Sequence, residues 1–221
     1  MTNSLPIVEM RGITITFPGV KALDGVDFRL FPGEVHALMG ENGAGKSTLI
    51  KALTGVYQID SGSIVVTGQE RHFHSTADAQ SAGISTVYQE VNLCTNLSIG
   101  ENVMLGHEIR GPFGVNWKAT HKAATEALTR LGLEHLDTRK PLSSLSIAMQ
   151  QLVAISRAMV VQAKVLILDE PTSSLDAKEV EGLFAVIRSL RDQGVAILFV
   201  SHFLDQIYQI SDRMTVLRNG Q

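Results

Sequence analysis

One stretch decides the fold of this chain: VHALMGENGAGKSTLIKAL, residues 35–53. It begins as an apolar, strand-like run, continues through a glycine-rich loop and ends in residues that favour a helix. The loop matches GxxxxGK[ST], a pattern that wraps phosphate groups when it joins a strand to a helix. Glycines let such a loop curl so that its N–H groups converge on phosphate oxygens, and the helix N-terminus adds partial positive charge there. The sequence therefore predicts a nucleotide-phosphate site.

The whole loop is expected to contact the nucleotide. Its residues are Gly40, Glu41, Asn42, Gly43, Ala44, Gly45, Lys46, Ser47 and Thr48. Lys46 can reach the β- and γ-phosphates, and the Ser47 hydroxyl can ligate Mg²⁺. The simpler interpretation is a glycine-rich turn with an incidental lysine, and the matching strand and helix on either side argue against it.

The composition describes a chain that can bury a full hydrophobic core. Of its 221 residues, 44% are hydrophobic and 19% charged, which excludes disorder as the main state. The net charge of −3 argues against a protein held to nucleic acid by a basic surface. The single cysteine, Cys94, leaves no intrachain disulfide, which fits a reducing compartment. We expect a soluble protein, because no apolar run approaches the roughly 18 residues that cross a bilayer and the N-terminus lacks a signal-peptide pattern.

Short β-branched runs alternate with helical patterns, which predicts an α/β fold with a mostly parallel sheet. The expected strands are residues 7–10, 13–17, 26–30, 35–39, 63–66, 84–87, 165–168, 196–200 and 214–217. The first three lie close together and predict a small antiparallel sheet. The strands at 165–168 and 196–200 are uniformly apolar, as in parallel strands covered on both faces. Asn219-Gly220 predicts a type I′ hairpin turn, and with no return strand after it we expect a longer polypeptide.

Residues 90–162 have a different character and are expected to form a helical insert between two strands of the sheet. Helices are predicted at 98–105 and 146–159, each with a serine as N-cap. A third, amphipathic helix is indicated by the spacing of Trp117, Ala124, Leu128 and Leu131. We expect one domain, 1–221, with a nucleotide-binding core of 1–89 and 163–221 and a helical subdomain of 90–162.

Polar side chains follow two of the predicted parallel strands. Asp169 and Glu170 come directly after the strand at 165–168, so they would lie at the carboxyl edge of the sheet, where open α/β sheets bind ligands. Asp169 is suited to hold Mg²⁺, and Glu170 is suited to polarise an attacking water as general base. His202 leaves the strand at 196–200 in the same way. His72 and His74 lie in a polar stretch, and we interpret them as ordinary surface residues, because HxH spacing is weak evidence for a metal.

Together these residues resemble the ATP-binding subunits of ABC transporters, and the resemblance covers essentially the whole chain. Six segments carry it, in the family's order: Walker A at 40–48, the Q-loop at 87–90 (VYQE) with Gln89, the LSGGQ signature at 145–149 (LSIAM), Walker B at 166–171 (LILDEP), the D-loop at 173–176 (SSLD) and the switch histidine His202. The resemblance implies a P-loop NTPase fold with a RecA-like core, an N-terminal antiparallel β subdomain and a helical insert.

The resemblance also implies a role for individual residues toward ATP and Mg²⁺. Phe17 would stack on adenine, although the residue alone fits strand core equally well. The catalytic group would be Glu170, His202 and Gln89, and the metal group would be Ser47, Gln89 and Asp169. Ser146 would contact the γ-phosphate in trans, on a partner half. Ala148 and Met149 replace the signature's Gly and Gln, and the added methyl group of Ala148 is expected to loosen the contact with the site that receives this signature.

Further segments resemble the monosaccharide-import branch of the family, in which one polypeptide carries two ATPase halves. They are residues 17–23 (FPGVKAL), 40–42 (GEN) and 89–93 (QEVNL), and residues 146–159 and 202–206 resemble the galactofuranose importer's ATPase. The chain is similar to the first half. The implied function is an ATPase that energises sugar import from the cytoplasmic face of the membrane. The implied partners are the second half, membrane permease subunits and, indirectly, a periplasmic sugar-binding protein, with no nucleic acid or disulfide partner.

Three other functions remain as alternatives. A soluble ABC-type ATPase acting on nucleic acid or ribosomes would normally carry a long coiled-coil insert, zinc cysteines or a basic arm. A P-loop kinase is disfavoured by Ser146 and Gln89. A nucleotide-dependent interaction module without turnover is disfavoured by Glu170.

Overall fold

The computed structural model describes residues 5–88 and 93–221, so Gln89 lies outside the described residues. The chain divides into two compact units. The first comprises Met1–Thr86, Ala163–Glu170 and Leu190–Gln221, and the second comprises Val87–Gln162 and Pro171–Ser189. Residues 171–189, expected in the nucleotide-binding core, therefore fall in the second unit.

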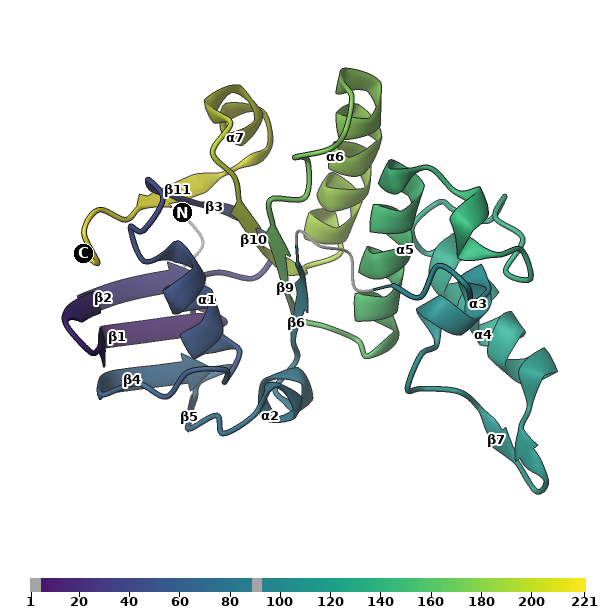
Figure 1. The fold of residues 1–221 in the computed structure, drawn as a ribbon, viewed down its shortest axis with the longest axis horizontal. Coiled ribbons are helices and arrows are strands. Elements are labelled where there is room, and N and C mark those ends of the chain that lie inside the picture. Colours follow the sequence, from purple (N-terminus) through teal and green to yellow (C-terminus); the bar gives the residue numbers. More distant parts are fainter. Residues whose placement is uncertain (1–4, 89–92) are drawn as a thin grey trace. The chain divides into compact units, whose positions relative to one another are not determined.

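Strands and helices are interspersed along the chain and alternate from α5 onward (Figure 1). In order they are β1 (Val8–Phe17), β2 (Val20–Leu30), β3 (Val35–Met39), α1 (Lys46–Leu53), β4 (Ser61–Val66), β5 (Gln69–Arg71), α2 (Thr76–Ser81), β6 (Ile84–Val87), α3 (Ile99–Val103), β7 (Arg110–Gly111), β8 (Gly114–Val115), α4 (Trp117–Thr129), a 3₁₀ turn (Leu142–Ser144), α5 (Ile147–Val160), β9 (Val165–Asp169), α6 (Ala177–Asp192), β10 (Ala196–Val200), α7 (Leu204–Ile210) and β11 (Arg213–Val216). The α/β class predicted from the sequence is confirmed.

A five-stranded sheet in the order β11-β3-β10-β9-β6 forms the centre of the first unit. Strands β3, β9 and β10 are almost wholly buried, as their mostly apolar sequences require for strands covered on both faces. They pair in parallel, and the register sets Val200 opposite both Leu38 and Asp169. The carboxyl ends of these strands therefore meet along one edge. Because β6 and β9 are neighbours in this sheet, the insert between them interrupts a single sheet, as predicted.

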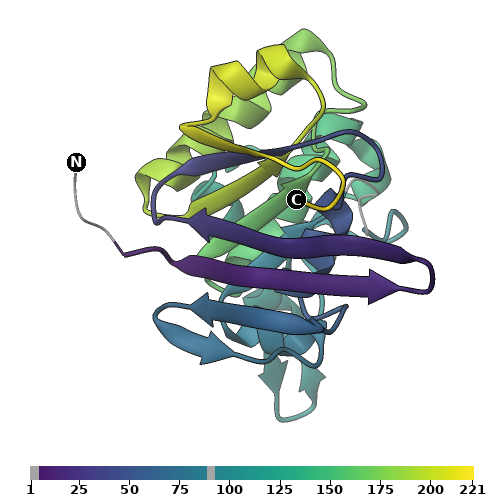
Figure 2. The same ribbon diagram turned by 90° about the vertical axis from the view of Figure 1, so that its left-hand side faces the viewer.

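The predicted antiparallel sheet has four strands in the order β2-β1-β4-β5, and Figure 2 shows its long strands β1 and β2 side by side. The segments predicted separately at 7–10 and 13–17 are one strand, β1, with a shift of register between Met10 and Ile13. Such an irregularity lets a strand continue through Gly12, which has a positive φ of 59°. Strand β5 was missed because its three residues are polar and carry no alternation.

The hydrophobic core of the first unit joins the two sheets through α1. Leu49, Ile50 and Leu53 of α1 are at most 1% exposed, since they recur on one face of the helix. They belong to one buried cluster with residues of both sheets, including Met10 of β1 and Leu198 of β10. The helix that follows the glycine-rich loop is thus held in place along its whole buried face.

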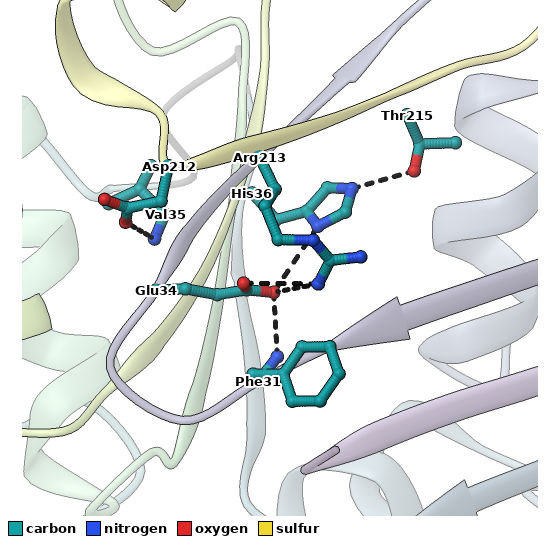
Figure 3. A network of polar contacts seen from close by, with 7 residues as sticks. All are labelled: Phe31, Glu34, Val35, His36, Asp212, Arg213 and Thr215. Carbon is teal, nitrogen blue, oxygen red and sulfur yellow. Dashed lines mark hydrogen bonds and ion pairs between the residues drawn. The ribbon is translucent and has the colours of Figure 1, made fainter. Parts of the chain in front are cut away.

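A polar network ties the edge strand β11 to β3 (Figure 3). The His36 side chain, 1% exposed, lies with Nε2 2.8 Å from Thr215 Oγ1 and Nδ1 3.4 Å from Glu34 Oε1. Arg213 Nη1 donates to the same carboxylate at 3.2 Å. Asp212 adds a further bond by accepting from the Val35 N–H at 2.8 Å. The strand that leads into the glycine-rich loop is therefore fixed at its start.

The Glu34 carboxylate is stabilised in its charged form by this network. Burial alone would raise the pKa of Glu34, but hydrogen bonds from His36 and the Phe31 N–H, together with the charge of Arg213, hold the pKa below its usual value of 4.5. Glu34 therefore contributes its charge to the fold at neutral pH.

The second unit contains α3, α4 and α5, which pack on one another. Helix α3 is shorter than predicted but begins at the expected cap, where Ser98 and Glu101 form a capping box. In α4, Ala124 and Leu128 are fully buried, whereas Trp117 is 48% exposed. The predicted amphipathic helix is confirmed, with Trp117 as its first residue.

Candidate functional site

The glycine-rich loop forms a tight curl between β3 and α1. Gly40 and Gly45 have φ values of 151° and 110°, in the region that favours glycine. A Cβ at Gly40 would lie 2.5 Å from the Leu217 carbonyl oxygen, and one at Gly45 would lie 2.9 Å from the Ala22 carbonyl oxygen. Both glycines are thus required by conformation and by space. The strand–loop–helix setting predicted for the phosphate-binding motif is confirmed.

Lys46 stands at the first position of α1 and folds back over the loop. Its ammonium donates hydrogen bonds to the carbonyl oxygens of Gly40 and Glu41, 2.6 and 3.2 Å away. A cavity of about 430 Å³ opens beside it, lined by Glu41 through Thr48 and by residues of two other segments. The cavity therefore combines the Lys46 ammonium with the N-terminus of a helix, two features that favour the binding of phosphate groups.

The chain's last described turn forms another wall of this cavity. Asn219 and Gly220 both have positive φ, 52° and 77°, and the Gln221 N–H donates to the Arg218 carbonyl at 3.0 Å, so the predicted type I′ turn is confirmed. The Gly220 N–H donates to the Ala44 carbonyl at 3.1 Å. Sequence reasoning found the turn but missed its place, because nothing in residues 218–221 signals a contact with a loop some 175 positions earlier.

The other side of the turn is joined to the start of β2. The Gly220 carbonyl accepts from the Asp24 N–H at 2.8 Å, and a Cβ at Gly220 would come within 2.8 Å of the Ala22 carbonyl oxygen. Val20, Lys21 and Ala22 also line the cavity. The turn thus connects the β1–β2 hairpin to the phosphate-binding loop.

Asp169 lies at the carboxyl end of β9, as predicted, and is partly buried. Burial and the neighbouring charge of Glu170 raise the pKa of Asp169, while the charges of Lys46 and Lys51 act in the opposite direction. The acidic strand end thus lies near enough to Lys46 for the two charges to attract each other.

Glu170 and His202 form a pair at the same edge. His202 Nδ1 lies 3.0 Å from Glu170 Oε2, and the Glu170 side chain is 15% exposed whereas that of His202 is 59% exposed. Glu170 adopts a positive φ of 48°, and its N–H donates to the Val200 carbonyl at 2.9 Å. A left-handed conformation in a residue with a side chain costs about 1–2 kcal/mol and occurs preferentially at functional sites. The sequence predicted the side chains but not this backbone conformation.

Phe17 ends β1 and is 36% exposed, so it is not a core residue of the strand. Its ring packs edge-to-face against Tyr57, with centroids 5.2 Å apart and an angle of 70° between the planes. Sequence reasoning missed Tyr57. Among the described residues the phosphate cavity is lined by Val20, Lys21 and Ala22 of the same hairpin rather than by Phe17 itself.

Ser146 belongs to the second unit, where it is the N-cap of α5 and accepts a hydrogen bond from the Met149 N–H at 3.4 Å. This confirms the predicted cap and leaves Ser146 exposed. Ala148, which replaces a signature glycine, is 8% exposed. Gln89, the remaining predicted site residue, lies outside the described residues.

The oxygen-bearing side chains of the site fit a magnesium ion whose remaining ligands come from phosphate and water. In the described part of the chain, no group of three or more His, Cys, Asp or Glu side chains could hold a metal. Mg²⁺ commonly takes only one or two protein oxygens and completes its shell with phosphates and water. The Ser47 hydroxyl and the Asp169 carboxylate are oxygens of the kind required.

Fold and site together define an ATP-binding cassette. The family model described as "ABC transporter" matches residues 23–173, and the chain belongs to this family. Solved structures agree. The chain resembles a nucleotide-free ATP-binding cassette from an ABC transporter with a TM-score of 0.86 and 28% identity, covering 98% of this chain and 89% of that one. It resembles the ADP conformation of another cassette with a TM-score of 0.88 and 27% identity, over 99% and 89% of the two chains.

Curated relatives are sugar-import proteins. The chain is 74% identical to the fructose import ATP-binding protein FruK of Bifidobacterium longum, over 100% of this chain and 43% of that protein. It is 58% identical to the galactofuranose transporter ATP-binding protein YtfR of Escherichia coli K12, over 97% and 43%. The galactofuranose relative, to which residues 146–159 and 202–206 pointed, is thus less similar than the fructose relative. The chain spans about 43% of the length of these relatives.

Proposed function

We propose that this chain binds ATP with Mg²⁺, hydrolyses it to ADP and phosphate, and serves as one ATPase half of a monosaccharide importer. The observation that carries the proposal is the meeting of three strand ends in one sheet. The loop with Lys46 follows β3, Asp169 ends β9 with Glu170 directly after it, and His202 follows β10. Parallel pairing brings these ends to a single edge, where open α/β sheets bind ligands.

Lys46 would bind the β- and γ-phosphates. Its ammonium is held by two carbonyl oxygens of the loop, so it can exchange these neutral acceptors for charged phosphate oxygens, which make stronger hydrogen bonds. Ser47 and Asp169 would hold Mg²⁺, which supplies neutralising charge on the phosphate oxygens. Phe17, which is 36% exposed, would stack on the adenine, and Tyr57 packs against its ring.

Glu170 would accept the proton of the attacking water as general base. His202 would keep the Glu170 carboxylate in place through the contact at Nδ1, leaving Nε2 for the γ-phosphate. Gln89 would add a ligand at the metal and the reacting phosphate. Phosphoryl transfer depends on positioning and charge neutralisation more than on covalent chemistry, and these roles supply both.

The transport cycle would require two halves, because one half alone supplies only one side of the γ-phosphate. Ser146 at the N-terminus of α5 would approach the nucleotide of the partner half, while that half's signature approaches Lys46 of this one. Closure around ATP and release after hydrolysis would form a two-state switch. Membrane permease subunits would convert the switch into import, with a periplasmic binding protein supplying the sugar.

A peripheral position on the cytoplasmic face of the membrane follows from this assignment. In the part of the chain that the structure describes, no helix is both long and apolar enough to cross a bilayer. The sugar would be a monosaccharide, with fructose and galactofuranose as the first to be tested, since two relatives are named for the transport of these sugars.

Copurification from membranes tests this proposal directly. We expect the tagged protein to copurify with a membrane permease. Vesicles into which the copurified complex is reconstituted should accumulate labelled fructose or galactofuranose only with ATP. Recovery with ribosomes or nucleic acid, and no permease, would instead support the soluble ABC-type ATPase.

A further inference from the structure

A second cavity lies in the first unit, apart from the phosphate-binding loop. It measures about 290 Å³, and its walls include Tyr57, Gln58, Arg71, His72, Phe73 and His74. No carboxylate is among the residues that line it. The cavity therefore combines one permanent cation, two imidazoles and two aromatic rings without a counter-charge of its own.

Arg71 is the residue of this cavity that most needs a ligand. Its Nη2 donates to Gln69 Oε1 at 2.6 Å, but its Nε is buried and has no hydrogen-bond partner among the described residues. Leaving a buried donor unsatisfied is unfavourable, and more so when the donor belongs to a charged group. The Nε itself is closed to solvent and therefore to a ligand, so a bound anion would contact the outer nitrogens of the guanidinium group and balance its charge.

The acidic groups near the cavity are few and already engaged or distant. Glu70 Oε1 is 4.0 Å from His72 Nε2, beyond hydrogen-bond distance, and both side chains are largely exposed. Asp78 accepts the backbone N–H of His74 at 2.9 Å and caps the turn before α2. Neither carboxylate neutralises Arg71, so the cavity is suited to an anion.

We propose that this cavity binds a small organic phosphate of about the size of a hexose phosphate. Arg71 and the two histidines would hold the phosphate, since guanidinium and imidazole groups are suited to phosphate oxygens. Phe73 and Tyr57 would offer apolar ring surface to the carbon skeleton, and the Gln58 amide would contact its hydroxyls. A volume of about 290 Å³ is at the lower limit of ligand pockets, which excludes a large molecule.

Tyr57 connects this cavity to the nucleotide site. Its ring packs against Phe17, and its hydroxyl lies 3.5 Å from Lys51 Nζ of α1, the helix that carries Lys46. A molecule that contacts Tyr57 would change the support of the ring expected to stack on adenine. This coupling rests on the proposed nucleotide site, whereas binding in the cavity does not. Occupancy of the cavity would therefore alter the affinity for ATP.

Titration calorimetry with fructose 6-phosphate as probe tests the binding. We expect the wild-type chain to bind it at concentrations of about 10 mM or lower and Arg71→Gln to weaken binding about tenfold or more. Arg139→Gln, which removes an exposed arginine of the second unit, is the charge-matched control and should bind as the wild type does. Circular dichroism and thermal unfolding would establish that each variant is folded. Absence of binding to the wild type, or equal binding by folded Arg71→Gln, would overturn the proposal.

Two further arms identify what is recognised. Unphosphorylated fructose should bind at least about tenfold more weakly than the phosphate ester, because it lacks the charge that Arg71 requires. Equal affinity for fructose would contradict the anion site. Lys46→Ala should retain its affinity for fructose 6-phosphate even though it no longer binds ATP. The anion site and the nucleotide site are therefore tested independently.

The coupling has its own readout. Saturating fructose 6-phosphate should change the ATP dissociation constant of the wild type about fivefold or more, and should leave that of Arg71→Gln unchanged. An ATP affinity that is the same with and without the ester would refute the coupling through Tyr57.

Discussion

Replacing Gly220 by alanine tests whether the last described turn supports the phosphate-binding loop. Gly220 has a φ of 77°, and a Cβ there would lie 2.8 Å from the Ala22 carbonyl oxygen, closer than real Cβ atoms approach. The neighbouring atom belongs to the backbone and cannot rotate away. The hydrogen bonds that residue 220 makes with Ala44 and Asp24 would have to lengthen to accommodate the methyl group.

The size of the effect can be estimated from two contributions. The left-handed backbone costs alanine about 1–2 kcal/mol, and overpacking against a fixed neighbour costs about 1–3 kcal/mol. Gly220→Ala should therefore lower the free energy of unfolding by about 2–5 kcal/mol. Gly68→Ala is the matched control, because Gly68 has a φ of 76° and nothing within 4 Å of the added Cβ. It should lower the free energy of unfolding by only about 1–2 kcal/mol.

The affinity for ATP should separate the two variants as well. In Gly220→Ala, weakening of the hydrogen bond from the residue 220 N–H to Ala44 should reduce the binding free energy of ATP by about 0.5–1.5 kcal/mol. This corresponds to roughly a 2- to 12-fold rise in the ATP dissociation constant. Gly68→Ala, in the turn between β4 and β5, should bind ATP as the wild type does. Urea unfolding followed by circular dichroism and titration calorimetry with Mg²⁺ and ATP measure the two quantities. Equal unfolding free energies and equal affinities for the two variants would refute the supporting role of the turn.

The remaining predictions concern three carboxylates. Glu170→Gln should keep ATP binding but slow hydrolysis in the assembled transporter by about 10²–10⁴-fold, measured as phosphate release, and a normal rate would assign the base to another group. Burial and the charge of Glu170 raise the pKa of Asp169 in the folded protein, so its contribution to stability is present below the usual pKa of 3.8 and is lost as the pH rises through the raised pKa. Asp169→Asn, which carries no charge, should therefore be more stable to urea than the wild type at pH 7. A variant less stable than the wild type would contradict the raised pKa. The pKa of Glu34 is lowered, so its stabilisation is present above pH 4.5 and lost as pH falls through the lowered pKa. Glu34→Gln should lower the free energy of unfolding by about 1–3 kcal/mol at pH 7, and the difference from the wild type should disappear in acid. A difference in unfolding free energy that is independent of pH would argue against the charged network.

Most of the parallel sheet could be predicted from local sequence. The strands at 35–39, 84–87 and 196–200 agree with β3, β6 and β10 residue for residue, because short runs rich in apolar and β-branched residues bounded by turn residues leave little ambiguity. The N-terminal strands were less accurate, since β1 continues through a bulge at Gly12 that local alternation interprets as a break. Helices α2 and α7 are short, at six and seven residues, and give too few repeats to be recognised.

The candidate site likewise has a part that local sequence predicts and a part that it does not. Loop residues 40–48 and the strand ends at Asp169, Glu170 and His202 were predictable, because each motif has a fixed position relative to its own strand. The contacts of Gly220 with Ala44, and of Tyr57 with Phe17, were not, because they join residues far apart in the chain. The positive φ of Glu170 follows from tertiary context and has no sequence signal in a residue other than glycine or asparagine.

Titration calorimetry of the folded chain with ATP and Mg²⁺ is the most direct test of the phosphate-binding loop around Lys46. The wild type should release heat with one nucleotide bound per chain, and Lys46→Ala, although folded, should show little or none. Binding of equal strength by Lys46→Ala, or no heat from the wild type with either ATP or ADP, would contradict the assignment of this loop.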